Sequence, residues 1–151
     1  AWKDIVQVQL GLTAQSSKYK EARAWSDDVE ATREMFRTPN FHGYCTASYI
    51  PVKNLTLALS GTYTGKMLIE HHAGMIERNV TVRTPDFWDM GLKVAYDFRL
   101  YKSFKLQLNA GAQNIFNSFQ KDFDRGEDRD SGYMYGPTLP RTFFFGVKLM
   151  Y

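Results

Sequence analysis

The residues that could bind a metal ion come together at one place in the sequence. Glu70, His71 and His72 follow one another and carry the side chains that commonly bind metals. Neighbouring residues of an extended chain point to opposite sides, so the two imidazoles could not readily share one ion there. We interpret both histidines as loop residues, and the sequence predicts neither a metal site nor a cofactor.

A second candidate is the acidic stretch "DFDRGEDRD", Asp122 to Asp130, which has the crowded carboxylates of a calcium loop. Its spacing differs from the EF-hand pattern. Arg125 and Arg129 offset its charge. We therefore expect a solvated, internally paired loop and not a cation site.

A hydrolase would need a serine beside a histidine. The histidines are His42, His71 and His72, and Ser48 lies six residues from His42 on the same parity. At about 3.3 Å per residue this separation is roughly 20 Å, which is beyond hydrogen-bond reach. The sequence therefore predicts that the protein is not an enzyme.

Six stretches alternate between apolar and polar residues with the period of two that is typical of β-strands. They predict strands at 3–18, 41–51, 54–69, 86–99, 103–116 and 141–151. Strands of ordinary sheets average about 5 to 6 residues, whereas tilted membrane strands need about 9 to 11. Aromatic residues lie near both ends of several apolar faces, as at the two interfaces of a bilayer. These stretches favour membrane strands.

The polar faces of these strands carry charged residues, which suits a water-filled lumen. On this parity lie Lys93, Asp97, Lys105 and Lys148. A charge inside a barrel needs a partner or water. Cys45 falls on the opposite, lipid-facing parity, where it is a small apolar residue.

The connections alternate between long and short. The long ones are 19–40, 70–85 and 117–140, and the short ones are "PVKN" and "LYKS". Outer-membrane barrels have short periplasmic turns and long extracellular loops. The fold class predicted is therefore all-β, an antiparallel up-and-down transmembrane β-barrel in which each strand pairs with its sequence neighbour. A soluble antiparallel β-domain is the alternative.

The bulk composition agrees with this interpretation. Aromatic residues make up 15% of the 151 residues while the mean hydropathy is negative, as in strands that alternate. The net charge of +3 is spread along the chain, so we expect no nucleic-acid partner. A single cysteine excludes an internal disulfide.

Three stretches resemble the C-terminal end of TonB-dependent outer-membrane receptors. They are "QNIFN" at 113–117, "YGPTLPR" at 135–141 and the final strand "RTFFFGVKLMY" at 141–151. The family most often ends in Phe, whereas this chain ends in Tyr151. The stretch "DFDRGEDRDSGYMYGP" is similar to sequences of receptors from the Bacteroidetes.

The resemblance implies a barrel of about 22 strands with a plugged lumen, in the outer membrane of a Gram-negative bacterium. Residues 1–151 would be the last six strands, so we expect a fragment that lacks the plug domain and the remaining strands. Implied partners are outer-membrane lipid, the rest of the receptor and the TonB complex. The barrel-assembly machinery would read the last strand as an assembly signal, formed by Phe143, Phe145, Val147, Leu149 and Tyr151.

Such receptors import scarce ligands with energy from the inner-membrane TonB system. The charged lumenal residues would contact the plug or be hydrated. In the longest loop the sequence predicts ligand-binding residues with cationic and flat surfaces: Arg125, Arg129, Tyr133 and Tyr135. They point to a ferric siderophore or another metal chelate; cobalamin, a glycan or a peptide remain open, as does a structural or adhesive barrel. Alternatively, the loop only shields the barrel mouth or packs on its neighbours.

Overall fold

The computed structural model describes residues 5–101 and 103–151, and its regular secondary structure is entirely β. The start of the first predicted strand, residues 3 and 4, lies outside the described residues, as does Lys102 in the "LYKS" turn. In the part of the chain that is described, no helix is long and apolar enough to cross a membrane.

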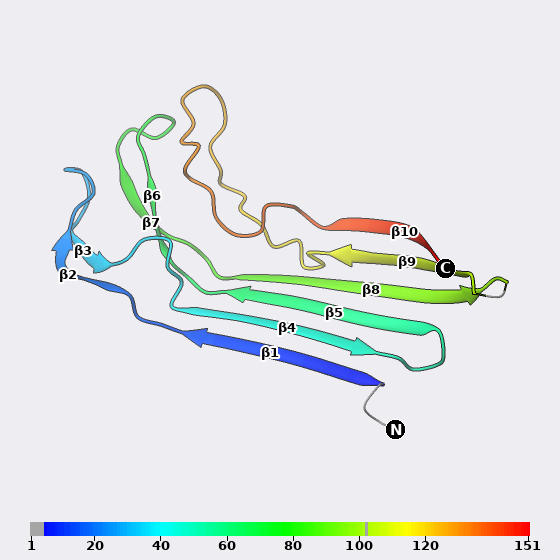
Figure 1. Ribbon diagram of the computed structural model, residues 1–151. Coiled ribbons are helices and arrows are strands. Elements are labelled where there is room, and N and C mark those ends of the chain that lie inside the picture. The colour runs from blue at the N-terminus through cyan, green and yellow to red at the C-terminus, as the bar shows by residue number, and fades with distance from the viewer. Residues whose placement is uncertain (1–4, 102) are drawn as a thin grey trace.

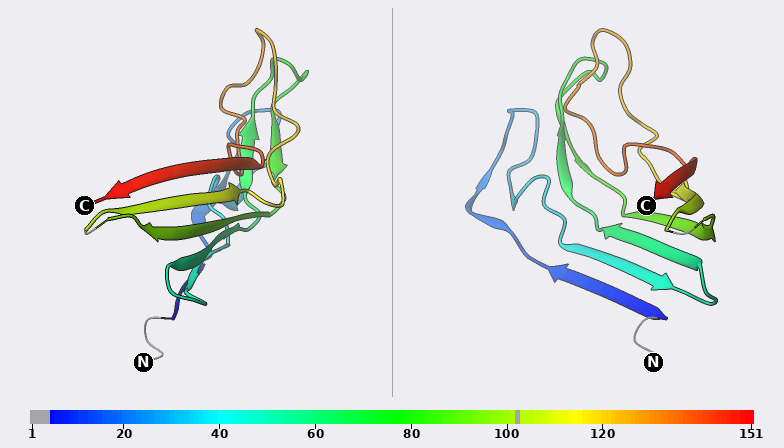
Figure 2. Two further views of the ribbon diagram at one scale, coloured as in Figure 1. Left: turned by 90° about the vertical axis from the view of Figure 1, so that its right-hand side faces the viewer. Right: turned by 45° about the vertical axis from the view of Figure 1, so that its right-hand side comes forward.

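One six-stranded antiparallel sheet dominates the structure (Figure 1). Its strands lie in the spatial order β1 (Val6–Ala14), β4 (Phe41–Tyr49), β5 (Leu55–Thr64), β8 (Phe87–Arg99), β9 (Lys105–Gln113) and β10 (Thr142–Met150). Each strand pairs with the next of the six along the chain. The prediction of an all-β, antiparallel, up-and-down arrangement is confirmed. The sheet is strongly twisted and open, with β1 and β10 as its edges among the described residues (Figure 2).

Two further hairpins correct the predicted strand bounds. The hairpin of β2 (Lys18–Arg23) with β3 (Thr32–Glu34) lies in the first long connection, and the hairpin of β6 (Leu68–His71) with β7 (Val80–Arg83) lies in the second. The first sheet strand therefore ends at Ala14, and the third predicted strand is divided between β5 and β6.

Gly65 gives the physical reason for the break after β5. Its amide donates a hydrogen bond of 2.8 Å to the carbonyl of Phe41, and a Cβ at this position would lie 2.8 Å from the same oxygen. Only glycine allows so close a backbone approach. The alternation of residues continues through this point, so the sequence pattern alone could not show where the chain leaves the sheet.

The two faces of the sheet differ in polarity. One continuous row across all six strands is apolar and consists of Val8, Ala47, Leu59, Leu92, Ala112 and Phe143. The neighbouring row on the other face consists of Gln7, Ser48, Ala58, Lys93, Gly111 and Phe144. Val8 is 69% exposed and Phe143 is 75% exposed, so the apolar face is open and does not form a core. The largest buried apolar side chains instead lie near the loops: Leu68, Ile69, Phe87 and Tyr133.

The "QNIFN" stretch closes the end of β9. Asn114 is 2% exposed and adopts a left-handed backbone conformation with φ of 47°. Its Nδ2 donates to the carbonyls of Ser118 (3.1 Å) and Leu139 (2.8 Å), and its Oδ1 accepts from the Ser118 amide (2.8 Å). Asn117 accepts a hydrogen bond from the Arg141 amide at 2.9 Å. The two asparagines thus connect the end of β9 to the approach of β10.

Candidate ligand-binding loops

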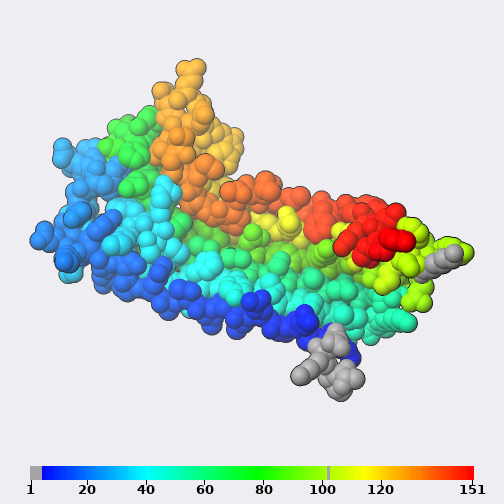
Figure 3. All heavy atoms as spheres, in the orientation of Figure 1, coloured from blue at the N-terminus to red at the C-terminus, as the bar shows by residue number. Residues whose placement is uncertain are grey.

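All three long connections leave the same end of the sheet, and the short turns lie at the opposite end (Figures 1 and 3). We refer to residues 15–40, 65–86 and 114–141 as loops L1, L2 and L3. The one-sided arrangement predicted from the alternating loop lengths is therefore present. The loops are hydrogen-bonded to one another, as follows.

L1 and L2 contact through polar side chains. The indole of Trp25 donates to Thr81 Oγ1 at 2.9 Å, and Asn79 Nδ2 donates to Ser26 Oγ at 2.9 Å. Arg83 Nη2 donates to both carboxylate oxygens of Glu34 at 3.0 and 2.9 Å. These contacts join β7 to L1, so the first two loops form one assembly.

Arg37 joins L1 to L3. This residue has φ of 54°, and its guanidinium donates to the carbonyls of Gly132 (2.6 Å) and Met134 (3.2 Å). Its Nε also lies 4.0 Å from a carboxylate oxygen of Glu70 in L2. One side chain therefore contacts both of the other loops.

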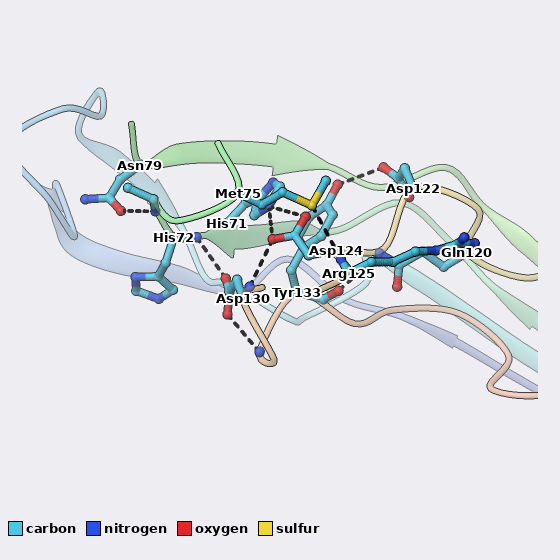
Figure 4. A network of polar contacts seen from close by, with 12 residues as sticks. His71, His72, Met75, Asn79, Gln120, Asp122, Asp124, Arg125, Asp130 and Tyr133 are labelled. Carbon is cyan, nitrogen blue, oxygen red and sulfur yellow. Dashed lines mark hydrogen bonds and ion pairs between the residues drawn. The ribbon is translucent and has the colours of Figure 1, made fainter. Parts of the chain in front are cut away.

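A buried pair joins L2 to L3 (Figure 4). The Nε2 of His71 lies 3.0 Å from both carboxylate oxygens of Asp124, and the two side chains are 9% and 1% exposed. The His71 ring stacks on Tyr133, with ring centroids 3.6 Å apart and 7° between the planes. The amide of Asp130 donates to Asp124 at 2.9 Å, and the amide of His72 donates to Asp130 at 2.8 Å.

Asp122 holds the two tyrosines of L3. The hydroxyl of Tyr133 donates to one of its carboxylate oxygens at 2.8 Å, and the hydroxyl of Tyr135 donates to the other. Burial raises the pKa of Asp122, but hydrogen bonds from Tyr135 and Tyr133 outweigh it and hold this pKa below its ordinary value. Burial and the bond to Asp122 raise the pKa of Tyr133 to about 12. The same two causes raise the pKa of Tyr135 well above its ordinary value.

The other two carboxylates of the network are also stabilised in their charged form. The hydrogen bond from the Asp130 amide, followed by that from His71, lowers the pKa of Asp124. Burial raises the pKa of Asp130, but bonds from the amides of His72 and Gly132 lower it overall. Above pH 4 these carboxylates are therefore ionised and accept all their hydrogen bonds.

Two expectations from the sequence are corrected here. His71 is the last residue of β6 and is buried, so it is not a plain loop residue. The acidic stretch is not simply solvated, because Asp124 is 6% exposed and contacts His71. Its arginines form no ion pair within the described residues. In the described part of the chain, no three His, Cys, Asp or Glu side chains are arranged so that they could hold a metal ion. His72 instead packs edge-on against Trp25.

The four predicted ligand-binding residues lie in two environments. Arg125 and Arg129 are exposed; the guanidinium of Arg125 lies 4.9 Å from the ring centre of Phe123, and Arg129 donates to the Gly126 carbonyl at 2.8 Å. Tyr133 is 3% exposed and Tyr135 is half-buried. The two tyrosines thus hold L3 in shape, while the two arginines lie at its surface. The role of all four in ligand binding stays a prediction.

A recess of about 640 Å³ lies within L3. Arg129 lines it together with the aromatic residues Phe119, Phe123, Tyr133 and Tyr135 and the carboxylates of Asp124 and Asp130. One cationic group, two carboxylates and four rings therefore meet at one hollow surface. The rings and Arg129 can contact a planar anionic group there, whereas the two carboxylates oppose its charge.

Sequence reasoning missed Asp124, Arg37 and Trp25, which make three of the contacts between loops. The partners of these residues are 53, 95 and 56 positions away in the sequence. No local spacing links such distant residues. Only the closeness of the loops in the folded chain brings them together.

The predicted lumenal charges share one face of the sheet. The register places Lys93, Asp97, Lys105 and Lys148 on the polar face. Gln107 donates to Asp97 at 2.7 Å. On the opposite face the residues of the predicted assembly signal are between 60% and 92% exposed. Contact of the charges with a plug domain, and the assembly role of the last strand, stay predictions.

The comparison with known proteins comes from structure. No family model matches the chain, and no curated protein matches it. The chain is similar to a solved structure, the ferric-catecholate import receptor Fiu from E. coli in its closed form. The TM-score is 0.62 at 22% sequence identity, over 95% of this chain but 18% of that receptor. The chain therefore has the fold of a segment of an import receptor. The similarity gives no support to a Bacteroidetes origin.

Proposed function

We propose that this chain is the C-terminal part of the barrel of a TonB-dependent outer-membrane receptor. The observation that carries the proposal is the polarity of the sheet. Across six strands one face is apolar and exposed, and the other carries amides, hydroxyls and charges. Bilayer on one side and water on the other account for this pattern. The resemblance of the three C-terminal stretches and the fold shared with an import receptor support the same conclusion.

In this proposal the chain forms the last six strands of a barrel of about 22 strands. The apolar face contacts outer-membrane lipid, and the long loops lie outside the cell. The rest of the receptor supplies the plug and the contact with the TonB complex. The barrel-assembly machinery recognises the last strand, and no chemical reaction is catalysed.

The receptor imports a scarce ligand, and a ferric siderophore or another anionic metal chelate fits L3 best. Arg125 and Arg129 provide exposed positive charge, and the recess beside Arg129 is lined by aromatic rings. Binding residues commonly lie on loops held by a rigid scaffold. The hydrogen bonds between L1, L2 and L3 provide that rigidity.

The experiment replaces both arginines in the full-length receptor, Arg125→Ala with Arg129→Ala. We expect at least tenfold weaker binding of a ferric catecholate chelate, because two charge-assisted contacts are lost at about 1.5 kcal/mol or more each. Lys20→Ala is the matched control, since Lys20 is an exposed cation in L1. Binding by isothermal calorimetry and uptake of labelled iron are the measurements.

Surface levels must be equal in all variants. Unchanged affinity and uptake in the double variant would show that L3 does not bind the ligand and only shields the barrel mouth. Absence of the full-length protein from the outer-membrane fraction would overturn the receptor proposal as a whole.

A further inference from the structure

Three aromatic rings form a row on the apolar face of the sheet, at the end that carries the long loops. They belong to Phe41 at the start of β4, Tyr63 near the end of β5 and Trp88 near the start of β8. The ring centroids of Phe41 and Tyr63 lie 5.7 Å apart, and those of Tyr63 and Trp88 lie 4.8 Å apart. Phe41 is 39% exposed and Trp88 is 53% exposed, so both rings are open to contact. We refer to the three rings as the aromatic row.

Two recesses meet at Trp88. The first, of about 410 Å³, lies over β1, β4 and β5, and beside the aromatic row it is lined by Leu10, Leu12, Gly43, Cys45 and Gly61. The second, of about 930 Å³, is lined by Trp88 and Met90 of the sheet and by Phe116 and Phe119 of L3. Trp88 and Asp86 line both recesses. Two hollows with largely apolar walls therefore start from one point, and a molecule with two apolar chains can occupy both.

One carboxylate and one amine lie beside these apolar walls. Asp86 and Lys121 both line the second recess, and both are exposed. The hydroxyl of Tyr63 donates to Asp86 at 3.3 Å, and the ion pairs of the described residues involve other groups. Asp122 also lines this recess, but both of its carboxylate oxygens accept hydrogen bonds from the two tyrosines of L3. A molecule in the recess would therefore meet Asp86 and Lys121 as its charged partners.

A carboxylate, an amine and aromatic rings together select the chemistry of the occupant. A cation is attracted both to a carboxylate and to the face of an aromatic ring. A phosphate makes charge-assisted hydrogen bonds with a lysine ammonium group. A phosphoethanolamine headgroup carries both an ammonium and a phosphate, and its lipid has two apolar chains. An acidic lipid without an amine would instead bring negative charge to Asp86 with no cation to offset the repulsion.

We propose that the aromatic row and its two recesses bind a membrane lipid that carries a phosphoethanolamine headgroup. The ammonium contacts Asp86 and the ring of Trp88, the phosphate contacts Lys121, and the acyl chains lie in the two recesses. Aromatic residues are common at bilayer interfaces and select no headgroup by themselves, so the preference comes from the two charges. The inference rests on the proposed function, because it requires the apolar face to lie in a bilayer, and it goes further by assigning one lipid class to one site.

The test uses the full-length receptor in detergent and measures lipid binding by native mass spectrometry. The probes are phosphatidylethanolamine and phosphatidylglycerol with the same acyl chains. We expect phosphatidylethanolamine to bind about fivefold more tightly, the size expected for a cation–π contact combined with an exposed charge pair. Asp86→Asn should abolish this preference, whereas Asp86→Glu, which keeps the carboxylate, should retain it. Lys121→Gln should weaken the binding of both lipids about threefold, because both carry a phosphate.

The controls change charges at the same end of the sheet that line neither recess. They are Asp89→Asn, on the polar face, and Lys66→Gln, just after β5; both residues are exposed. Neither substitution should change the affinity for either lipid.

Three results would overturn the proposal. The first is equal binding of the two lipids by the parent protein, and the second is an unchanged preference in Asp86→Asn. The third is the same loss of binding in Lys121→Gln and Lys66→Gln, which would indicate the charge of the whole surface and not a site. Absence of the receptor from the outer membrane would contradict the proposed function, whereas normal insertion without a lipid preference would contradict this inference alone.

Discussion

Replacing Asn114 by alanine tests whether this side chain locks L3 to the end of the sheet. The substitution removes three hydrogen bonds, at 3.1, 2.8 and 2.8 Å. The groups left without a partner are the carbonyls of Ser118 and Leu139 and the amide of Ser118. At about 1 kcal/mol per bond the loss is about 3 kcal/mol. An alanine held at φ of 47° adds about 1 kcal/mol, since asparagine tolerates the left-handed region better.

Water offsets part of this cost, because Leu139 is 60% exposed and its carbonyl can be hydrated. We expect a net loss of about 2 to 3 kcal/mol in the free energy of local opening. That corresponds to amide exchange at Ser118 that is about 30 to 150 times faster. The assay is hydrogen–deuterium exchange of the full-length protein, followed in peptides that cover 115–120.

Two further variants separate the causes. Asn114→Gly relieves the backbone strain but still loses the three hydrogen bonds, so its exchange should remain at least tenfold faster than in the parent protein. Gln113→Ala changes an exposed neighbour that makes no side-chain hydrogen bond within the described residues, and exchange at Ser118 should not change. Exchange in Asn114→Ala within a factor of two of the parent protein would refute the reasoning.

Three other predictions concern the loops and the sheet. The pKa of Tyr133 is raised to about 12, so the stability that this residue contributes is present below pH 10 and is lost as the pH rises towards 12. The pKa of Asp124 is lowered, so the stability that this carboxylate contributes is present above about pH 4 and is lost as the pH falls below it. Amide exchange in L3, corrected for intrinsic rates, should therefore accelerate below about pH 4 and above about pH 10. An exchange rate that does not change in this way between about pH 3 and about pH 12 would contradict the hydrogen-bond network. Arg37→Ala should accelerate exchange in 131–136 about fivefold, for a loss of about 1 kcal/mol, whereas Arg33→Ala, which removes a bond within L1, should not. Gly111→Ala places a Cβ 2.3 Å from the Leu92 carbonyl oxygen and should lower the free energy of unfolding by urea in detergent by about 2 kcal/mol or more. In the control, Gly126→Ala, the Cβ meets no atom within 4 Å, and only the positive φ should cost about 1 kcal/mol. Equal effects of the two substitutions would refute the steric argument.

The sequence alone determined the sheet, because strand formation follows a local pattern. The period of two placed Val8, Leu92 and Phe143 on one face and Gln7 and Lys93 on the other, and the register confirms both sets. Connection length determined strand order in the same way, since a turn as short as "PVKN" can only join neighbours. The predicted bounds were wrong where alternation continued past a break, as at Gly65.

The loop contacts were decided only by the tertiary structure. Nothing near His71 in the sequence indicates Asp124, and nothing near Arg37 indicates the carbonyl of Gly132. These pairs form because the twisted strands bring three separate connections to one place. A charged or polar group buried there costs free energy unless it is paired with another. The same physics buries Tyr133 within L3, where it also lines the recess beside Arg129, and its role in ligand binding stays a prediction. The sequence therefore does not show whether a polar residue in a long loop contacts a ligand or another loop.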